Sequence, residues 1–226
     1  WRLTYDGLSK LKFAKKLFNS VSLSHGYRSS YGISSFNTSL LYKEDGSARD
    51  LSNNFIPKQE FGQITISEQF SPLVGIDINW KNNKLTTRFE YKRDRNLSLT
   101  FADIQLSETK GQEFVLGAGY RWRNFKMPFK IGGAKKKGPS NNDLNLTADF
   151  SIRKNSTIIR KLLENIDQPT AGLTIFSFKL AADYVINERF NVRLFFDKTI
   201  NNPLISTSFP TANTAAGISV RFTLAQ

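Results

Sequence analysis

The side chains that most often catalyse reactions or hold metals are scarce in this sequence. Its 226 residues include no cysteine and one histidine, His25. The absence of cysteine excludes disulfides, thiolate nucleophiles and thiolate metal ligands, and one histidine cannot form a multi-histidine metal site. His25 lies in an alternating segment, where a polar strand residue is a simpler interpretation than a general base. We therefore expect no enzyme, no cofactor and no metal site.

Charged side chains of both signs are abundant, and many recur at every second position. This spacing places them together on one face of an extended strand. Mixed charge on a pore wall can solvate a passing client without holding it tightly, which conduction requires. Pairing across strands to satisfy a polar surface is the alternative. The candidate pore-lining residues are Asp77, Arg88, Glu90, Arg121, Asp149, Arg153, Lys179, Asp183, Arg193, Asp197 and Arg221.

The chain is strongly basic, with a formal net charge of +13 and a pI of about 9.9. Such a charge can attract the phosphates of nucleic acids. Only the three lysines at 135–137 form a basic run, however, and they lie in a Gly-rich connection, whereas the other basic residues are interspersed with acidic ones. We interpret the run as a solvated loop and expect no nucleic-acid partner.

Apolar residues alternate with these polar residues along each segment and leave one face of it without charge. This period of two predicts antiparallel strands. Several segments sustain it over the roughly 9 to 11 residues that a tilted strand needs to cross a bilayer, beyond the about 5 to 6 of most soluble strands. The mean hydropathy of −0.37 does not conflict, because only alternate residues of a barrel strand face lipid. The segments are 73–80, 85–92, 114–123, 144–153, 174–186, 190–197 and 216–224.

Aromatic residues near the segment ends favour a membrane neighbour. Rings with a polar edge form girdles at both interfaces of outer-membrane barrels, although strands are rich in aromatics in general. We predict an all-β fold of antiparallel transmembrane β-barrel strands, in one domain over residues 1–226. The candidate lipid-facing or girdle residues are Trp80, Tyr91, Tyr120, Trp122, Tyr184, Phe190, Phe196 and Phe222.

Other segments are less regular. The pattern predicts one very long strand through residues 20–42, bent near Gly32, a polar loop over 45–57, and a strand at Ile64 and Ile66 that Pro72 ends. It also predicts a hairpin turn at 82–83 and another at 187–188. A strand over 97–106 is expected to contain a bulge, because its apolar parity shifts, and to be followed by a turn near Gly111.

Two segments have helical spacing and predict short helices in connections, at residues 9–18 and 156–167. The first is basic and amphipathic, so it is either a packed turn helix or a helix on a membrane surface. The strand total is about eleven, although closed single-chain barrels normally have an even number. The first residues also have no feature of a signal peptide. We therefore expect the chain to be a piece of a longer barrel wall.

Several segments resemble the C-terminus of the SprA (Sov) family. This family is the outer-membrane translocon of the type 9 secretion system of Bacteroidetes and is linked to gliding motility. The resemblance covers most of this chain but only the C-terminal portion of that very large protein. The matching segments are LSHGYR at 23–28, NERFNVRL at 187–194, NNPL at 201–204, FPTAN at 209–213 and GISVRF at 217–222.

The resemblance implies a giant single-chain barrel in the bacterial outer membrane, with a wide pore that opens laterally. It implies as partners the remainder of the translocon chain, a PorV-type barrel, a plug protein, secreted client proteins, membrane lipid and lipopolysaccharide. It supplies no catalytic residues. Two alternatives stay open: a complete small porin-like or TonB-dependent-receptor-like barrel, and a soluble β-sandwich binding module.

The final strand is also a candidate assembly signal, because barrel-insertion machinery reads terminal strands with alternating apolar residues. Many outer-membrane proteins end on an aromatic residue, and the end at Gln226 departs from that pattern. The candidate signal residues are Gly217, Val220, Phe222 and Leu224.

Overall fold

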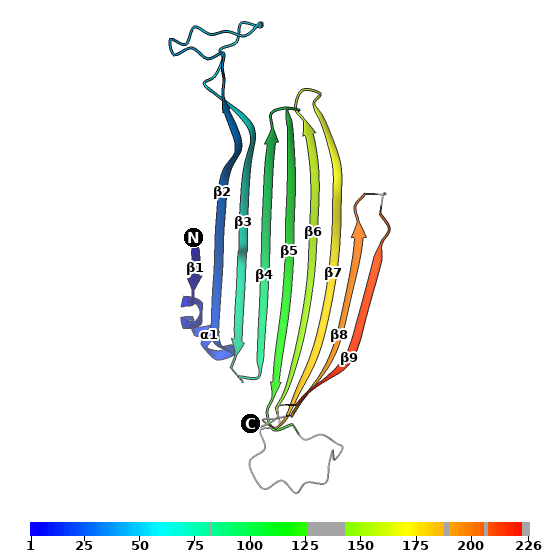
Figure 1. The fold of residues 1–226 in the computed structure, drawn as a ribbon. Coiled ribbons are helices and arrows are strands. Elements are labelled where there is room, and N and C mark those ends of the chain that lie inside the picture. The colour runs from blue at the N-terminus through cyan, green and yellow to red at the C-terminus, as the bar shows by residue number, and fades with distance from the viewer. Residues whose placement is uncertain (82, 126–142, 188–189, 206–207, 223–226) are drawn as a thin grey trace.

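The computed structural model describes residues 1–81, 83–125, 143–187, 190–205 and 208–222. They form one antiparallel sheet in which each strand pairs with the strands before and after it in the chain (Figure 1). The all-β prediction is confirmed, and the sheet is open, because β1 and β9 each pair with one described strand. The strands are β1 (Arg2–Tyr5), β2 (Phe18–Thr38), β3 (Gln59–Trp80), β4 (Leu85–Thr100), β5 (Gln105–Trp122), β6 (Leu144–Lys161), β7 (Ile166–Asn187), β8 (Phe190–Pro203) and β9 (Thr211–Phe222).

A short helical connection joins β1 to β2. It consists of the 3-10 helix η1 (Gly7–Lys10) and the α-helix α1 (Lys12–Leu17). The helix predicted over residues 9–18 is confirmed for α1, while the extended backbone of Leu11 separates it from η1. No helix in the described ranges is long and apolar enough to span a membrane.

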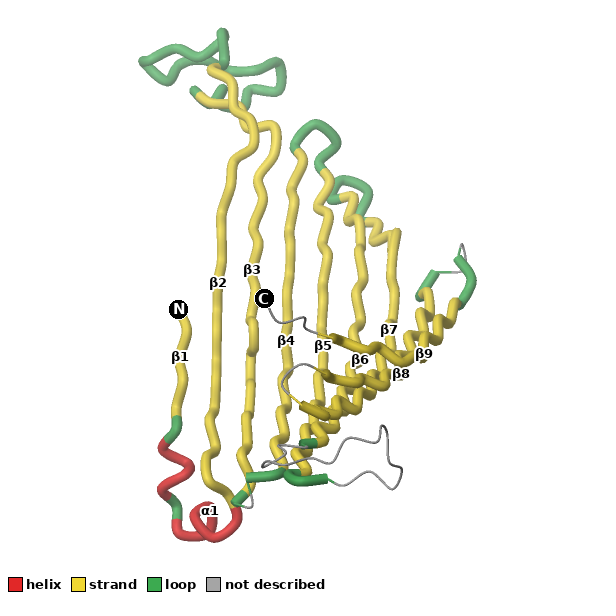
Figure 2. The backbone as a smooth tube through the Cα atoms, turned by 60° about the horizontal axis from the view of Figure 1, so that its bottom comes forward, coloured by secondary structure: helices red, strands yellow, loops and turns green. Residues whose placement is uncertain are grey.

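The strands are long and the sheet is one layer thick. β3 and β7 have 22 residues each, against about 5 to 6 for a typical strand. The register of β4 and β5 is unbroken from the pair Leu85 and Tyr120 to the pair Thr100 and Gln105. The sheet is also curved, with β8 and β9 turned out of the plane of β2 to β4 (Figure 2). Alternation therefore gives each strand two distinct faces over most of its length.

The predicted hairpin between β3 and β4 is confirmed. Asn83 has a φ of 51°, a left-handed conformation that asparagine adopts more readily than most residues. The polar loop at 45–57 is also confirmed, and it contains one isolated bridge, between Arg49 and Phe55. The predicted turn at 187–188 and the lysines at 135–137 involve residues outside the described ranges, as does Leu224.

Two strand boundaries differ from the predictions. Pro72 does not end a strand; β3 continues to Trp80, and the pairing with β4 shifts between Phe70 and Val74 around the residue that has no N–H to donate. The long strand β2 is confirmed but ends at Thr38, and its pairing with β3 becomes irregular from Ile33 to Phe36, next to the predicted bend.

The predicted bulge within 97–106 is wrong. The chain reverses there, in a turn at 101–104 where Ile104 has a φ of 46°, so the parity shift marks a new strand. The turn predicted near Gly111 is wrong as well, because Gly111 lies inside β5 opposite Asp94. A side chain at 111 would collide with the Asp94 carboxylate, which explains a glycine within a strand.

The helix predicted over 156–167 is also wrong. Residues up to Lys161 continue β6, a turn follows, and β7 begins at Ile166. Thr157, Ile158 and Ile159 are β-branched, and such side chains favour the pleated sheet over the helix. The described residues therefore form nine strands, fewer than the about eleven expected, because several predicted pieces belong to one longer strand.

The sheet has almost no buried core. Among the described residues the buried hydrophobic ones are Ala14 in α1, Ala48 in the polar loop, and Val21 and Tyr184 in the sheet, and none of these described side chains is completely buried. The accessible surface is 16703 Å² for a mass of 25.7 kDa, whereas a folded water-soluble monomer of that mass exposes about 10,400 Å². Stability in this architecture must come from hydrogen bonds between strands and from whatever covers the two faces.

Candidate functional site

All eleven candidate pore-lining residues lie on one face of the sheet, which we call the polar face. Residues directly opposite each other on neighbouring strands share a face, and so do residues two apart on one strand. One row of opposed residues crosses six strands and contains both signs of charge. The row is Asp77, Arg88, Gly117, Asp149, Lys179 and Asp197, on β3 to β8.

Ion pairs engage six of these eleven residues, which are Asp77, Arg88, Glu90, Arg121, Asp183 and Arg193. Arg88 Nε lies 2.9 Å from Asp77 Oδ1, and Arg193 Nε lies 3.7 Å from Asp183 Oδ1. The Arg88 side chain is 59% exposed, so the pair is in contact with solvent and contributes little stability. The other members form no ion pair with a described residue, so pairing across strands does not account for the whole face. These members are Asp149, Arg153, Lys179, Asp197 and Arg221.

A shallow groove runs across the polar face between β3 and β6. Its volume is about 310 Å³, and Asp77, Arg88, Gly117 and Asp149 are among its lining residues. A Cβ added at Gly117 would lie 2.8 Å from Asp149 Oδ1, so glycine leaves room for the carboxylate to lie over the strand. The polar face is therefore wettable at its centre.

All eight candidate lipid-facing residues lie on the opposite face, which we call the apolar face. At the same strand end as α1 their rings form edge contacts: Trp80 with Phe18 at 4.9 Å, and, at the other edge of the sheet, Phe190 with Phe222 at 6.4 Å between centroids. Farther along the strands Tyr91 stacks on Phe114 at 4.4 Å. Aromatic residues therefore occur near both ends of the uncharged part of this face.

The uncharged part of the apolar face is continuous over seven strands, and we call it the apolar belt. It contains no charged side chain, and its one aliphatic hydroxyl, on Thr87, accepts a hydrogen bond from Trp80 Nε1 at 3.3 Å. Many of its side chains are exposed, among them Leu116 at 54%. The belt comprises the alternate residues, on this face, of 74–80, 85–91, 114–122, 144–152, 176–184, 190–196 and 216–222.

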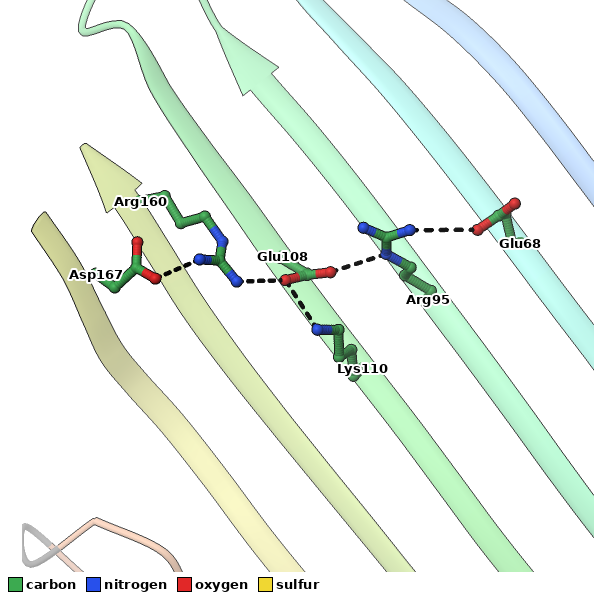
Figure 3. Close-up of polar contacts among 6 residues, drawn as sticks. All are labelled: Glu68, Arg95, Glu108, Lys110, Arg160 and Asp167. Atoms are coloured by element: carbon green, nitrogen blue, oxygen red, sulfur yellow. Dashed lines mark hydrogen bonds and ion pairs between the residues drawn. The ribbon is translucent and has the colours of Figure 1, made fainter. Parts of the chain in front are cut away.

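Beyond the belt, at the end far from α1, the same face carries a charged network centred on Glu108 (Figure 3). The Glu108 carboxylate accepts hydrogen bonds from Arg95 Nε at 2.8 Å and Arg160 Nη2 at 3.0 Å, and Lys110 Nζ lies 3.1 Å away. Glu68 and Asp167 extend the network through Arg95 and Arg160. It thereby links five strands, β3 to β7.

The Glu108 side chain is only 4% exposed, which by itself favours the protonated acid. Burial raises the pKa of Glu108, but hydrogen bonds from Arg160, Lys110 and Arg95 outweigh it and lower the pKa to about 2. Glu108 is therefore ionised at neutral pH. The sequence interpretation missed this cluster because it placed a helix at 156–167; the alternation of Arg93 and Arg95, and of Glu108 and Lys110, was the available signal.

A second polar clasp lies at the α1 end of the sheet. Asp143 Oδ2 accepts hydrogen bonds from Arg121 Nη2 at 2.6 Å and Nε at 2.9 Å, and its Oδ1 accepts one from the Asn124 backbone at 3.2 Å. This side chain joins the end of β5 to the start of β6. Arg121 was a candidate from the sequence, but Asp143 could not be recognised before the register was known.

The remaining sequence candidates are placed as follows. His25 lies in β2 with Nδ1 2.7 Å from the Leu73 carbonyl oxygen. Gly217 lies on the polar face, where an added Cβ would be 2.8 Å from Phe195 Cζ, while Val220 and Phe222 are exposed on the apolar face. The described residues contain no group of three or more histidines, cysteines or acids that could hold a metal.

The two faces of the sheet thus divide polar from apolar residues as the alternation predicts. No protein-family model matches this chain, and no curated protein sequence matches it.

Proposed function

We propose that this chain forms part of the wall of an outer-membrane protein-conducting barrel, the translocon of type 9 secretion. In this proposal the apolar belt faces lipid and the polar face lines the pore. The observation that carries it is an exposed, uncharged belt over seven strands, set directly behind a face that carries both signs of charge.

The belt supports a lipid neighbour because of its extent and its width. Soluble monomers rarely expose apolar patches larger than a few hundred Å². On β5 the belt runs over residues 114–122, and a tilted strand spans a bilayer with about 9 to 11 residues. Aromatic residues near both of its ends match the girdles of outer-membrane barrels.

A soluble sandwich would cover the apolar belt with a second sheet. The described residues form one layer and supply no such cover. Backbone groups on the open edges of β1 and β9 would also cost several kcal/mol each if left unpaired in lipid. Further wall strands beside these edges would satisfy them, as a longer barrel requires.

The polar face supports a conducting role through its chemistry. Its centre is an open groove with an Arg, two Asp and little side-chain bulk at Gly117. Fixed charges of both signs, several without a partner among the described side chains, keep water at the wall and offer a client only weak contacts. Binding is thus weak enough for a client to leave.

The assignment to type 9 secretion, linked to gliding motility, rests on the resemblance of segments such as 187–194 and 217–222 to the SprA family. It brings the proposed partners: the remainder of the translocon chain, a PorV-type barrel, a plug protein, secreted clients, and membrane lipid with lipopolysaccharide. A complete small porin-like barrel would share the two faces but would not conduct folded proteins.

Site-specific cross-linking tests the proposal on adjacent residues that face opposite ways. The full-length protein carries a cysteine in place of Asp149 on the polar face or of Phe150 in the belt, and a secreted client is stalled during export. We expect the client to cross-link through position 149 and not through 150. Equal cross-linking from both positions, or none from 149 while export proceeds, would contradict the proposal.

A further inference from the structure

We propose that Arg93, Lys154 and Lys198 bind the phosphate groups of lipids in the leaflet that borders the apolar belt at the end far from α1. We call these residues the cation row. The inference rests on the proposed insertion of the belt in a membrane, and it adds the residues and the chemical group by which the lipid partners would be bound.

The position of the cation row is set by the strands. Each member follows, by two residues, the last belt residue of its strand: Tyr91 on β4, Ile152 on β6 and Phe196 on β8. Steps of two keep a side chain on the same face of a strand. The row therefore lies on the apolar face, where the belt ends.

The lateral spacing follows from the register. Arg93 is opposite Gln112, and Gln112 is opposite Lys154, so these two cations are two strands apart in one transverse line. Two strand spacings are about 10 Å. Lys198 lies four residues nearer the belt's centre line, in register with Phe178. The belt's border is thus staggered along the sheet, as expected for tilted strands.

The cation row is uncompensated. All three residues are exposed, and none forms an ion pair with a described residue. The carboxylates beyond them on this face are already engaged: Glu108 by Arg95, Lys110 and Arg160, and Asp167 by Arg160. The network therefore takes up its own acids and leaves the positive charge of the row available to an external anion.

A phosphorylated lipid fits this arrangement better than a free anion. Its acyl chains would cover the belt while its phosphates meet the long side chains of the row, which can extend toward the headgroups. The belt also contains a hollow of about 440 Å³, formed where the small residues Ala118, Ala148 and Ala182 lie between Tyr120 and Phe196. This hollow can take an acyl chain.

The test removes the three charges together. The full-length protein with Arg93→Gln, Lys154→Gln and Lys198→Gln is placed in phosphatidylcholine nanodiscs and titrated with lipid A, a phosphorylated glycolipid. The matched control is Lys92→Gln, Arg153→Gln and Arg193→Gln, which removes three charges from the polar face of the same strands. With each cation contributing the usual increment at a lipid surface, we expect roughly 100-fold weaker lipid A binding in the first variant and unchanged binding in the control.

Four outcomes would overturn the inference. Lipid A binding that is unchanged in the first variant, or equally weakened in the control, would remove the cation row as the site. Full competition by inorganic phosphate would indicate a site for the free anion, and an acidic protein held at the row in purified wild type would indicate a protein site. Failure of the proposed membrane insertion, on which the inference rests, is separable, because the wild-type protein would then not enter the nanodisc at all.

Discussion

At the scale of single residues, Glu108 is the most strongly held acid that the structure describes. Three cations from three strands reach one nearly buried carboxylate. An ion at such a site is stabilised only while all its partners are present, and removing one member leaves the others uncompensated. The network therefore fixes the relative register of β4, β5 and β6 beyond the belt.

Replacing Glu108 with Gln should destabilise the protein. The three cations lose their shared counter-charge, and we expect a loss of about 1–3 kcal/mol in the free energy of unfolding. The matched control is Glu164→Gln, whose ion pair with Lys161 is exposed and should change stability by less than about 1 kcal/mol. Urea unfolding in detergent micelles measures both, and equal effects would contradict the role of Glu108.

The acid dependence of stability follows from the same carboxylate. Its folded pKa of about 2 lies below the ordinary value of 4.5, so Glu108 adds stability above pH 4.5 that is lost as the pH falls toward 2. Between pH 4.5 and pH 2 the free energy of unfolding should therefore fall further in the wild-type protein than in the Glu108→Gln variant. Parallel pH titrations of unfolding check this, and identical slopes would be inconsistent with the lowered pKa.

At the scale of elements, the faces of the belt strands were predictable from sequence and the strand ends were not. Alternation identifies a face without knowledge of the partner, so Arg88 and Phe178 could be assigned correctly. A turn has only a weak signature in the sequence, and a β-branched residue such as Ile104 does not predict the left-handed conformation that it adopts here. Ile158, Ile159 and Ile166 satisfy helical spacing, and only the pairing of β6 with β5 and β7 resolves them as strand.

For the candidate site, the sequence likewise predicts which face of a strand a residue lies on, but not which residues of neighbouring strands it meets. The polar face and the belt follow from a period of two within each strand. The Glu108 network and the Asp143 clasp depend on which residues of different strands lie together. The register between strands cannot be predicted from the residues of one strand alone. The cation row falls between these cases: its residues are visible in the sequence, but the border of the belt is defined only by the assembled sheet.

The turn between β6 and β7 offers a test that separates strand from helix at 156–167. Asn165 has a φ of 53° there. Asn165→Gly should be neutral or slightly stabilising, while Asn165→Val should cost about 1–2 kcal/mol because a β-branched residue resists this conformation. In a helix the order would reverse, with glycine the more costly. The two unfolding midpoints decide between these orders.

At the scale of the whole molecule, the sheet has two surfaces and almost no interior. With 16703 Å² of accessible surface and no completely buried side chain in the described ranges, it cannot be stable by the usual packing of a core. A bilayer on one side and a water-filled pore on the other would supply the missing environment. The chain transferred to water should therefore aggregate and regain a cooperative fold only in detergent or lipid.

The aromatic residues at the α1 end should report their depth. Trp80 and Trp122 lie at that border of the belt. We consider variants that keep Trp80 or Trp122 and carry phenylalanine at the other of these positions and at Trp1. Lipids brominated near the headgroup should quench their fluorescence more strongly than lipids brominated near the end of the acyl chain. Stronger quenching from the bilayer centre would place the border elsewhere.

The most direct test of the central claim is an accessibility scan of β7. The chain has no cysteine of its own, so a single cysteine introduced at each of residues 176–183 takes one spin label. In membranes, labels at 176, 178, 180 and 182 should collide mainly with oxygen, and labels at 177, 179, 181 and 183 mainly with a water-borne nickel chelate. Equal access of the chelate to both sets would contradict a wall between lipid and a pore.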